Sequence, residues 1–183
     1  MKKRETIVIN IIGGPGVGKS ILTSDVFSAL KREGISCEIS AEYIKRKLRE
    51  KALKAVESQI YIFAKQQYQL FTLKDEVDVI VTDSPIFLSA VYDKTKCPLL
   101  RALIMKEYNK YNSLNYLVVR DESFEYEQEG RYQDLDGAKK VDSHVTKFLD
   151  EEGIDYKLMH GIGPKTLKVI ITDIKAKLKE NES

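Results

Sequence analysis

Residues 13–20 read GGPGVGKS and match the phosphate-loop pattern G-x-x-x-x-G-K-[ST]. Glycine tolerates unusual backbone angles and lets the main chain approach a ligand closely, so successive N–H groups can surround a phosphate. In this pattern Lys19 reaches the β- and γ-phosphates, and the Ser20 hydroxyl helps to hold Mg²⁺. The pattern therefore predicts a nucleotide-binding site formed by Gly13, Gly14, Pro15, Gly16, Val17, Gly18, Lys19, Ser20 and Ile21.

The segments on either side of this loop have the form that the motif requires. An apolar, β-branched run of strand length, residues 6–12, precedes the loop. After the loop, apolar residues recur at helical spacing from Ile21 to Leu30, and Gly34 ends the predicted helix. The positive N-terminal end of that helix would point at the bound anion.

Predicted strands and helices alternate along the rest of the chain. We expect strands at 35–40, 77–82, 116–119 and 156–159, helices at 42–56, 58–73, 86–92, 99–111 and 137–150, and a closing amphipathic helix around 167–178. This order predicts an α/β fold: a three-layer α/β/α P-loop NTPase with a five-stranded parallel sheet. A length of 183 residues fits a single domain over residues 1–183, with a short lid at about 121–136.

Polar residues that directly follow the predicted strands are site candidates, because ligands of parallel sheets bind at the carboxyl ends of the strands. Asp83 stands where the Mg²⁺-linked acid of P-loop proteins is found, although it could instead cap the next helix. Glu42 could accept a proton from a substrate hydroxyl, or it could only stabilise the first turn of its helix. Arg120 follows the strand 116–119.

The segment 121–136 contains seven acidic residues and one basic residue, Arg131, and has no clear period. Long irregular segments of this kind are often lids that close over a substrate. Arginine is suited to bridging phosphates, so Arg131 and Arg120 together would fit phosphoryl transfer. The alternative is an exposed loop with a surface arginine.

Two predicted helices could contribute to a substrate pocket. Residues 45–54 contain six basic residues and one acid, which is either a solvated helix face or a patch for an anionic substrate, with Arg46 facing the ligand. The helix 58–73 has only Lys65 as a charged residue, so it should be largely covered, and Gln59, Gln66 or Tyr61 could line a pocket. One face of this helix carries Ile60, Phe63, Ala64, Gln67 and Phe71.

Composition and charge favour a cytoplasmic protein. The net charge of +2 is too small to indicate nucleic-acid binding from overall charge alone. No run of 18 or more apolar residues predicts a membrane span, and the phosphate loop stands where a signal peptide would lie. Cys37 and Cys97 have no metal-binding or redox spacing, which predicts reduced thiols.

Four short segments together resemble a known family. The phosphate loop, Glu42-Tyr43, Thr82-Asp83-Ser84 and Gly130-Arg131 occur in the order seen in nicotinamide riboside kinase domains of the NadR type. The sequence looks still closer to the small P-loop ATPase/kinase proteins of tailed bacteriophages grouped with that domain. The resemblance covers nearly the whole chain. It implies a kinase-like fold, MgATP as donor, the cytoplasm (of the host for a phage protein), and a pocket between the Glu42 helix, the 58–73 helix and the lid.

From these features we predict ATP-dependent phosphoryl transfer from MgATP to a small nucleoside or nucleotide hydroxyl. Ser20 and Asp83 would organise Mg²⁺, and Glu42 would orient or deprotonate the acceptor. The catalytic candidates are Lys19, Glu42, Asp83, Arg120 and Arg131. The candidates for substrate binding are Glu42, Tyr43, Arg46, Gln59 and Gln66.

Two other hypotheses stay open at this point. The acceptor could be DNA, either a 5′ end or a modified base such as 5-hydroxymethyluracil, which the basic run 45–54 favours. Alternatively, the chain could be a nucleotide-dependent binding module, an ATPase or GTPase switch in which the nucleotide orders the 121–136 segment for a partner. The choice between ATP and GTP and the oligomeric state are also open.

Overall fold

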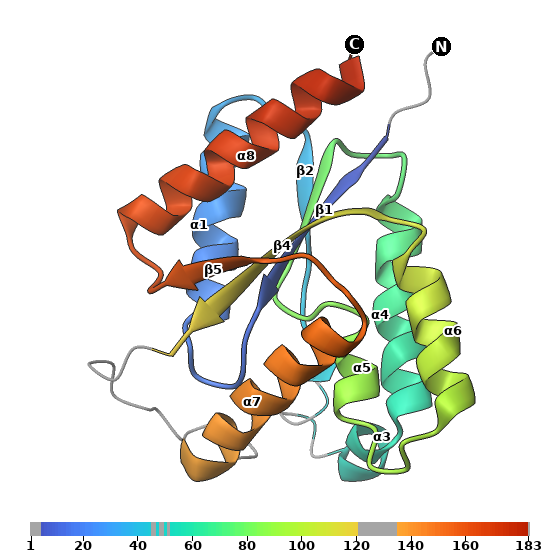
Figure 1. Cartoon of the computed structure of the whole chain (residues 1–183). Helices are drawn as coiled ribbons and strands as arrows, with labels where there is room; N and C mark the ends of the chain where they lie inside the picture. The colour runs from blue at the N-terminus through green and yellow to red at the C-terminus, as the bar shows by residue number, and fades with distance from the viewer. Residues whose placement is uncertain (1–4, 45–46, 48–49, 51, 121–134, 183) are drawn as a thin grey trace.

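The computed structural model describes residues 5–44, 47, 50, 52–120 and 135–182 (Figure 1). In this part of the chain, five parallel strands form one sheet in the order β2-β3-β1-β4-β5. The strands are β1 (Ile7–Ile12), β2 (Cys37–Ser40), β3 (Val79–Thr82), β4 (Asn112–Val119) and β5 (Lys157–His160). The helices are α1 (Lys19–Arg32), α3 (Leu53–Glu57), α4 (Gln59–Leu73), α5 (Leu88–Val91), α6 (Pro98–Tyr108), α7 (Leu135–Glu151) and α8 (Pro164–Glu182).

The alternation of side chains along β1 divides the interior into two apolar layers. Ile7, Ile9 and Ile11 pack with α1 and α8 on one face of the sheet. Val8 and Ile12 pack on the other face, against a cluster drawn from α4, α5, α6 and α7. All six residues of β1 are buried, as expected for a central parallel strand that is covered on both sides. The predicted three-layer fold is therefore observed (Figure 1).

The strand β4 is longer than the sequence pattern predicts, because it begins at Asn112 rather than at Tyr116. Its polar first half pairs in register with β1, so that Asn10 lies beside Asn115. The Asn115 Oδ1 accepts hydrogen bonds from Asn10 Nδ2 at 2.9 Å and from the Tyr108 hydroxyl at 3.0 Å. These bonds satisfy polar groups that would otherwise be costly to bury at this position.

The helix expected over residues 42–56 is not one continuous helix. Glu50 lies in a turn, Ala52 has no regular structure, and α3 begins only at Leu53. The break falls within the basic run 45–54, where like charges at helical spacing weaken a continuous helix.

The buried face of α4 also differs from the apolar face noted in the sequence. Ile60 and Phe71 are 67% and 63% exposed, whereas the buried residues of α4 are Ile62, Phe63, Gln66 and Leu70. Apolar residues occur on both sides of this helix, so its period alone does not decide which side packs against the sheet.

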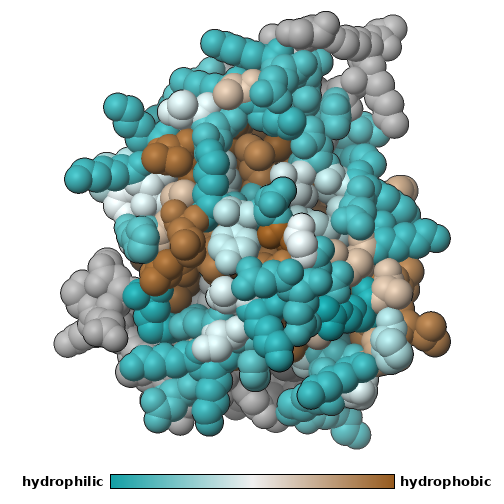
Figure 2. All heavy atoms as spheres, in the orientation of Figure 1, coloured by the Kyte–Doolittle hydropathy of each residue, from teal (hydrophilic) through white to brown (hydrophobic). Residues whose placement is uncertain are grey.

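The face of the molecule shown in Figure 2 is mainly polar. Hydrophilic residues cover most of the face shown in Figure 2, and hydrophobic residues appear there in separate patches. Among the helices of the described residues, none combines the length and the apolar character needed to cross a membrane.

Candidate active site

The phosphate loop joins β1 to α1 at the carboxyl edge of the sheet (Figure 1). Gly18 is the N-cap of α1 and has a φ of 87°, a left-handed conformation that favours glycine. As the N-cap, Gly18 has no side chain that could cap the first turn of α1, and no acidic residue lies in that turn. The backbone amides of the turn are therefore suited to bind an anion, as the sequence motif predicts.

The Lys19 side chain folds back over the loop that precedes it. Its Nζ donates a hydrogen bond to the Gly14 carbonyl oxygen at 2.7 Å. This contact keeps a positive charge beside the loop backbone, where the phosphates of a nucleotide would lie.

Ser20 and Asp83 contact each other directly, although 63 residues separate them in the sequence. The Ser20 hydroxyl donates to the Asp83 Oδ2 at 2.7 Å, and Asp83 is 6% exposed. They meet because β1 and β3 are parallel neighbours, with Asn10 opposite Thr82, so both strands end at the same edge.

A hydroxyl beside a carboxylate fits the chemistry of Mg²⁺, which prefers oxygen ligands and is commonly held by one or two carboxylates together with substrate phosphates. A cluster of three or more His, Cys, Asp or Glu side chains able to hold a metal ion does not occur among the described residues. The Ser20 hydroxyl and the Asp83 carboxylate are the oxygen groups here that could hold a Mg²⁺ together with nucleotide phosphates.

On the opposite side of the loop, Arg120 follows β4, the other neighbour of β1. Its Nε donates to Asp142 Oδ2 at 2.7 Å, and one of its terminal nitrogens, Nη2, donates to Asp142 Oδ1 at 3.2 Å. The same terminal nitrogen donates to the Pro15 carbonyl oxygen at 2.7 Å. Asp142 Oδ1 also accepts a hydrogen bond from the Gly14 N–H at 2.9 Å. Arg120 is therefore bound to the phosphate loop both directly and through Asp142.

Asp142 is a site residue that the sequence pattern does not reveal. The pattern of the predicted helix 137–150 draws attention to its apolar residues, and Asp142 lies four residues after the buried Ala138 and three before the buried Val145. The sequence signal that could have identified Asp142 is a carboxylate beside the apolar residues of a helix. Many solvent-exposed acids in helices have the same position, so the signal is not specific.

Beyond the Ser20–Asp83 pair, α4 connects the chain after β2 to the chain after β3. Gln66 of α4 is 2% exposed; its Oε1 accepts from the Tyr43 N–H at 3.3 Å, and its Nε2 donates to the Ser84 carbonyl at 3.1 Å. The Tyr43 and Tyr61 hydroxyl oxygens lie 2.5 Å apart. The neighbours of Tyr43 and Ser84 in sequence are Glu42 and Asp83, so Gln66 brings two predicted site segments together.

A family model described as an AAA domain matches residues 8–162, which span the phosphate loop, Asp83, Arg120 and Asp142. The chain belongs to this family. A search of curated proteins gave no match to this AAA domain.

Two solved structures resemble this AAA domain. The crystal structure of NadR protein in complex with NR aligns with a TM-score of 0.58 at 15% identity, over 86% of this chain and 44% of that chain. Deoxyadenosine kinase from M. mycoides with bound dATP aligns with a TM-score of 0.54 at 16% identity, over 92% of this chain and 99% of that chain. This AAA domain therefore spans less than half of the NadR chain. The likeness confirms the predicted P-loop, nucleoside-kinase-like fold and the resemblance to the NadR domain; a bacteriophage relationship stays a prediction.

Of the predicted site residues, the structure of this AAA domain brings the phosphate loop, Lys19, Ser20, Asp83 and Arg120 to one edge of the sheet. Glu42 is half-buried after β2, and Gln59 is half-buried at the start of α4. The Gln66 amide already bonds two backbone groups, so its predicted contact with substrate stays a prediction. Arg46, Arg131 and all but the last two residues of the predicted lid lie outside the described residues.

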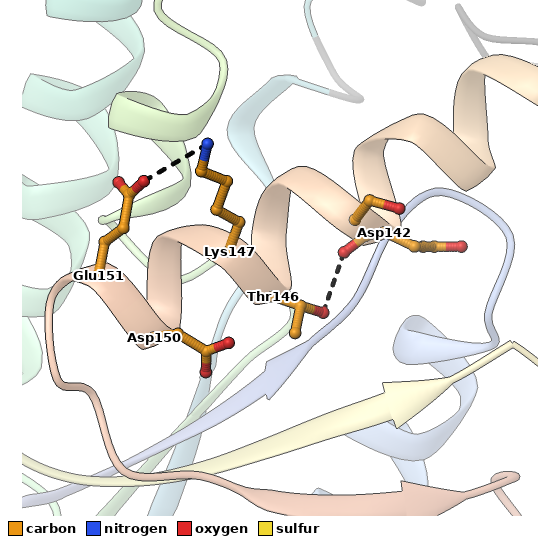
Figure 3. Close-up of a pocket in the computed structure, with 6 residues that line it drawn as sticks. Asp142, Thr146, Lys147, Asp150 and Glu151 are labelled. Carbon is orange, nitrogen blue, oxygen red and sulfur yellow. Dashed lines mark hydrogen bonds and ion pairs between the residues drawn. The ribbon is translucent and has the colours of Figure 1, made fainter.

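A shallow hollow of about 580 Å³ lies along one face of α7 (Figure 3). Its lining comes from this helix alone and consists of Asp142, Ser143, Thr146, Lys147, Asp150 and Glu151. Lys147 Nζ and Glu151 Oε1, which lie one turn apart on α7, form an ion pair at 3.7 Å (Figure 3). The hollow shares only Asp142 with the phosphate-loop network, so we assign the candidate active site of this AAA domain to the sheet edge and not to this hollow.

Proposed function

We propose that this AAA domain transfers the γ-phosphoryl group of MgATP to a hydroxyl group of a small nucleoside or nucleotide. The observation that carries the proposal is the Gln66 amide, which joins the Tyr43 backbone to the Ser84 backbone. It brings the segment that carries Glu42, an acceptor-side carboxylate, beside the segment that carries Asp83, the partner of Ser20. A nucleotide-binding module needs only the second of these segments.

On the donor side, the backbone amides of the phosphate loop and Lys19 bind the phosphates. Ser20 and Asp83 would hold Mg²⁺ through oxygen atoms. When bound, Mg²⁺ neutralises negative charge on the β- and γ-phosphate oxygens. Arg120 adds a permanent positive charge on the other side of the loop, because its guanidinium does not lose its proton in proteins.

On the acceptor side, Glu42 orients the acceptor hydroxyl and receives its proton. The hydroxyl oxygen forms a bond to the γ-phosphorus as the bond from that phosphorus to the β–γ bridging oxygen breaks, and ADP leaves. Arg131 of the predicted lid would balance charge in the same step. Most of the rate enhancement comes from position and charge, since phosphoryl transfer needs little covalent participation by the protein.

The proposal is tested with γ-labelled ATP and a panel of acceptors: nucleosides, nucleotides, nicotinamide riboside and oligonucleotides. We expect label on a small nucleoside or nucleotide, and none with the Lys19→Ala variant. Label that appears only as free phosphate would contradict the kinase proposal. Label on oligonucleotides alone, with a steep decrease of activity as salt increases, would replace the small acceptor by DNA.

A further inference from the structure

The carboxylate of Asp142 connects three parts of the molecule that are distant in sequence. Asp142 belongs to α7, Arg120 follows β4, and the phosphate loop follows β1. Asp142 Oδ1 accepts from the Gly14 N–H at 2.9 Å, and the two carboxylate oxygens accept two hydrogen bonds from Arg120, at 2.7 Å and 3.2 Å. Arg120 in turn donates to the Pro15 carbonyl oxygen at 2.7 Å. We call these four residues the loop clamp.

The loop clamp requires glycine at position 14. A Cβ atom built on Gly14 would lie 2.0 Å from Asp142 Oδ1 and 3.1 Å from the carbonyl oxygen of Ala138. The phosphate-loop pattern leaves this position variable, so the pattern itself does not explain the glycine. The close approach of α7 to the loop explains it, because only glycine leaves room for the Asp142 carboxylate to contact the loop.

The clamp also limits where the Arg120 guanidinium can lie. The Arg120 side chain is 13% exposed and the Asp142 side chain 29%. A two-point bond between a guanidinium and a carboxylate sets both the distance and the plane of the guanidinium. Without the Asp142 carboxylate, the hydrogen bond to Pro15 would be the contact of the loop clamp that still orients Arg120. The long Arg120 side chain would then regain rotamer freedom.

We propose that Asp142 is a positioning residue for phosphoryl transfer: it holds the Arg120 guanidinium against the phosphate loop, so that this charge is in place when a nucleotide binds. The inference rests on the proposed function. Asp142 acts through Arg120 and does not touch the reacting atoms. Its carboxylate accepts hydrogen bonds from both Arg120 and the Gly14 N–H, and Arg120 also donates to the Pro15 carbonyl of the loop.

A competing role for Asp142 would have the opposite effect. A carboxylate beside a phosphate site can repel the bound nucleotide, and its removal would then strengthen nucleotide binding. Positioning predicts instead that removal of Asp142 lowers turnover, changes the KM for ATP little, and has no further effect once Arg120 is gone. The two roles are therefore separated by whether Asp142 variants change kcat or the KM for ATP, and by whether the effects of Asp142 and Arg120 substitutions are coupled.

The experiment is a double-mutant cycle with Asp142→Asn, Arg120→Ala and the double variant, assayed with the acceptor that the wild-type protein uses. We expect Asp142→Asn to lower kcat about 10- to 100-fold, the range for residues that orient a directly acting group. The double variant should be no slower than Arg120→Ala. Asp150→Asn is the matched control, because it removes the same charge from an exposed position about two turns further along α7, and it should keep wild-type kcat.

Arg120→Lys tests the loop clamp without a substitution at Asp142, so the result does not depend on any effect of that substitution on folding. Lysine keeps the positive charge but cannot make the planar two-point bond, so kcat should fall as in Asp142→Asn. Wild-type protein without transfer to any acceptor contradicts the proposed function. If the wild-type protein is active, two results would overturn the positioning role. One is a fall in kcat for the double variant equal to the product of the two single falls, and the other is tighter ATP binding by Asp142→Asn.

Discussion

At the scale of single residues, the Ser20–Asp83 pair is the predicted Mg²⁺ site. The Asp83 Oδ2 accepts a hydrogen bond from the Ser20 hydroxyl at 2.7 Å, and Asp83 is almost fully buried. A hydroxyl and a carboxylate side by side offer oxygen ligands of the kind that Mg²⁺ prefers in proteins. A Mg²⁺ brought by the nucleotide would complete its coordination with phosphate oxygens and water.

We therefore predict that Asp83→Asn raises the Mg²⁺ concentration needed for half-maximal activity by about 10- to 100-fold. The amide keeps the size of the side chain but loses the charge that attracts the cation. The measurement is a titration of activity with MgCl₂ at fixed ATP. Asp25→Asn on the exposed side of α1 is the control and should leave the Mg²⁺ dependence unchanged. An unchanged Mg²⁺ requirement in Asp83→Asn would remove Asp83 from the metal site.

The residues found from sequence and those missed differ in what determines their place. Lys19 and Ser20 follow from a local pattern, and Asp83 from its position directly after a strand, so sequence alone could predict them. Asp142 is defined only by contacts with Gly14 and Arg120, which are 128 and 22 residues away in the chain. A tertiary contact of this kind leaves no regular spacing in the sequence.

At the scale of secondary-structure elements, α4 shows how far periodicity can be used. The helix was predicted within a residue of its observed bounds, since Ser58 is its N-cap and Leu73 its last residue. Its inner face was not predictable, because a polar residue, Gln66, lies on it between Ile62 and Leu70. Gln66 is buried there because the two ends of its amide replace the water that Tyr43 N–H and Ser84 C=O would otherwise bind.

Gln66→Met should disturb the acceptor side of the site more than the donor side. Methionine fills the space but cannot make the hydrogen bonds of the Gln66 amide to the Tyr43 N–H and the Ser84 carbonyl, a loss of about 0.5–1.5 kcal/mol for each. The segment that carries Glu42 then loses its connection to Ser84 through Gln66, while the contact between the Tyr43 and Tyr61 hydroxyls still joins it to α4. We expect the KM for the acceptor to rise more than the KM for ATP, and the free energy of unfolding to fall.

Steady-state kinetics with each substrate varied in turn, together with urea unfolding, would measure both effects. Gln67→Met is the matched control on the same helix, because Gln67 is half-buried and its side chain donates a weak hydrogen bond to Glu107, at 3.5 Å, instead of joining two backbone segments. Equal increases in the two KM values for Gln66→Met would indicate a general loss of structure, and would contradict a local role on the acceptor side.

At the scale of the whole molecule, the sheet order assembles the site. Because β1 lies between β3 and β4, its phosphate loop has Asp83 on one side and Arg120 on the other. Alternating strands and helices were enough to predict a parallel sheet with its ligands at one edge. The strand order itself depends on long-range packing of two apolar layers, and the polar first half of β4 shows that pairing in the sheet can override local composition.

The same apolar layers protect several tyrosines from ionisation, which makes alkaline stability a test of the core. Burial raises the pKa of Tyr108 and of Tyr116, and it raises the pKa of Tyr111 to about 12. In the unfolded chain a tyrosine ionises near pH 10. As the pH rises above about 10, the unfolded chain therefore loses protons that the folded protein retains, and the free energy of unfolding falls. The slope is about 1.4 kcal/mol per pH unit for each fully protected tyrosine.

Tyr116→Phe isolates one of these contributions. Tyr116 is 1% exposed, and its hydroxyl donates to Asp173 Oδ2 at 3.1 Å. At pH 8 the variant should be less stable than wild type by about 1 kcal/mol, because that hydrogen bond is lost. Above pH 10 the difference should shrink and then reverse, since phenylalanine does not ionise in the unfolded chain. Urea unfolding of both proteins between pH 8 and pH 11 measures this difference. Lysines titrate alike in the two proteins and cancel, so a difference that stays constant over this range would show that Tyr116 is not protected in the folded state.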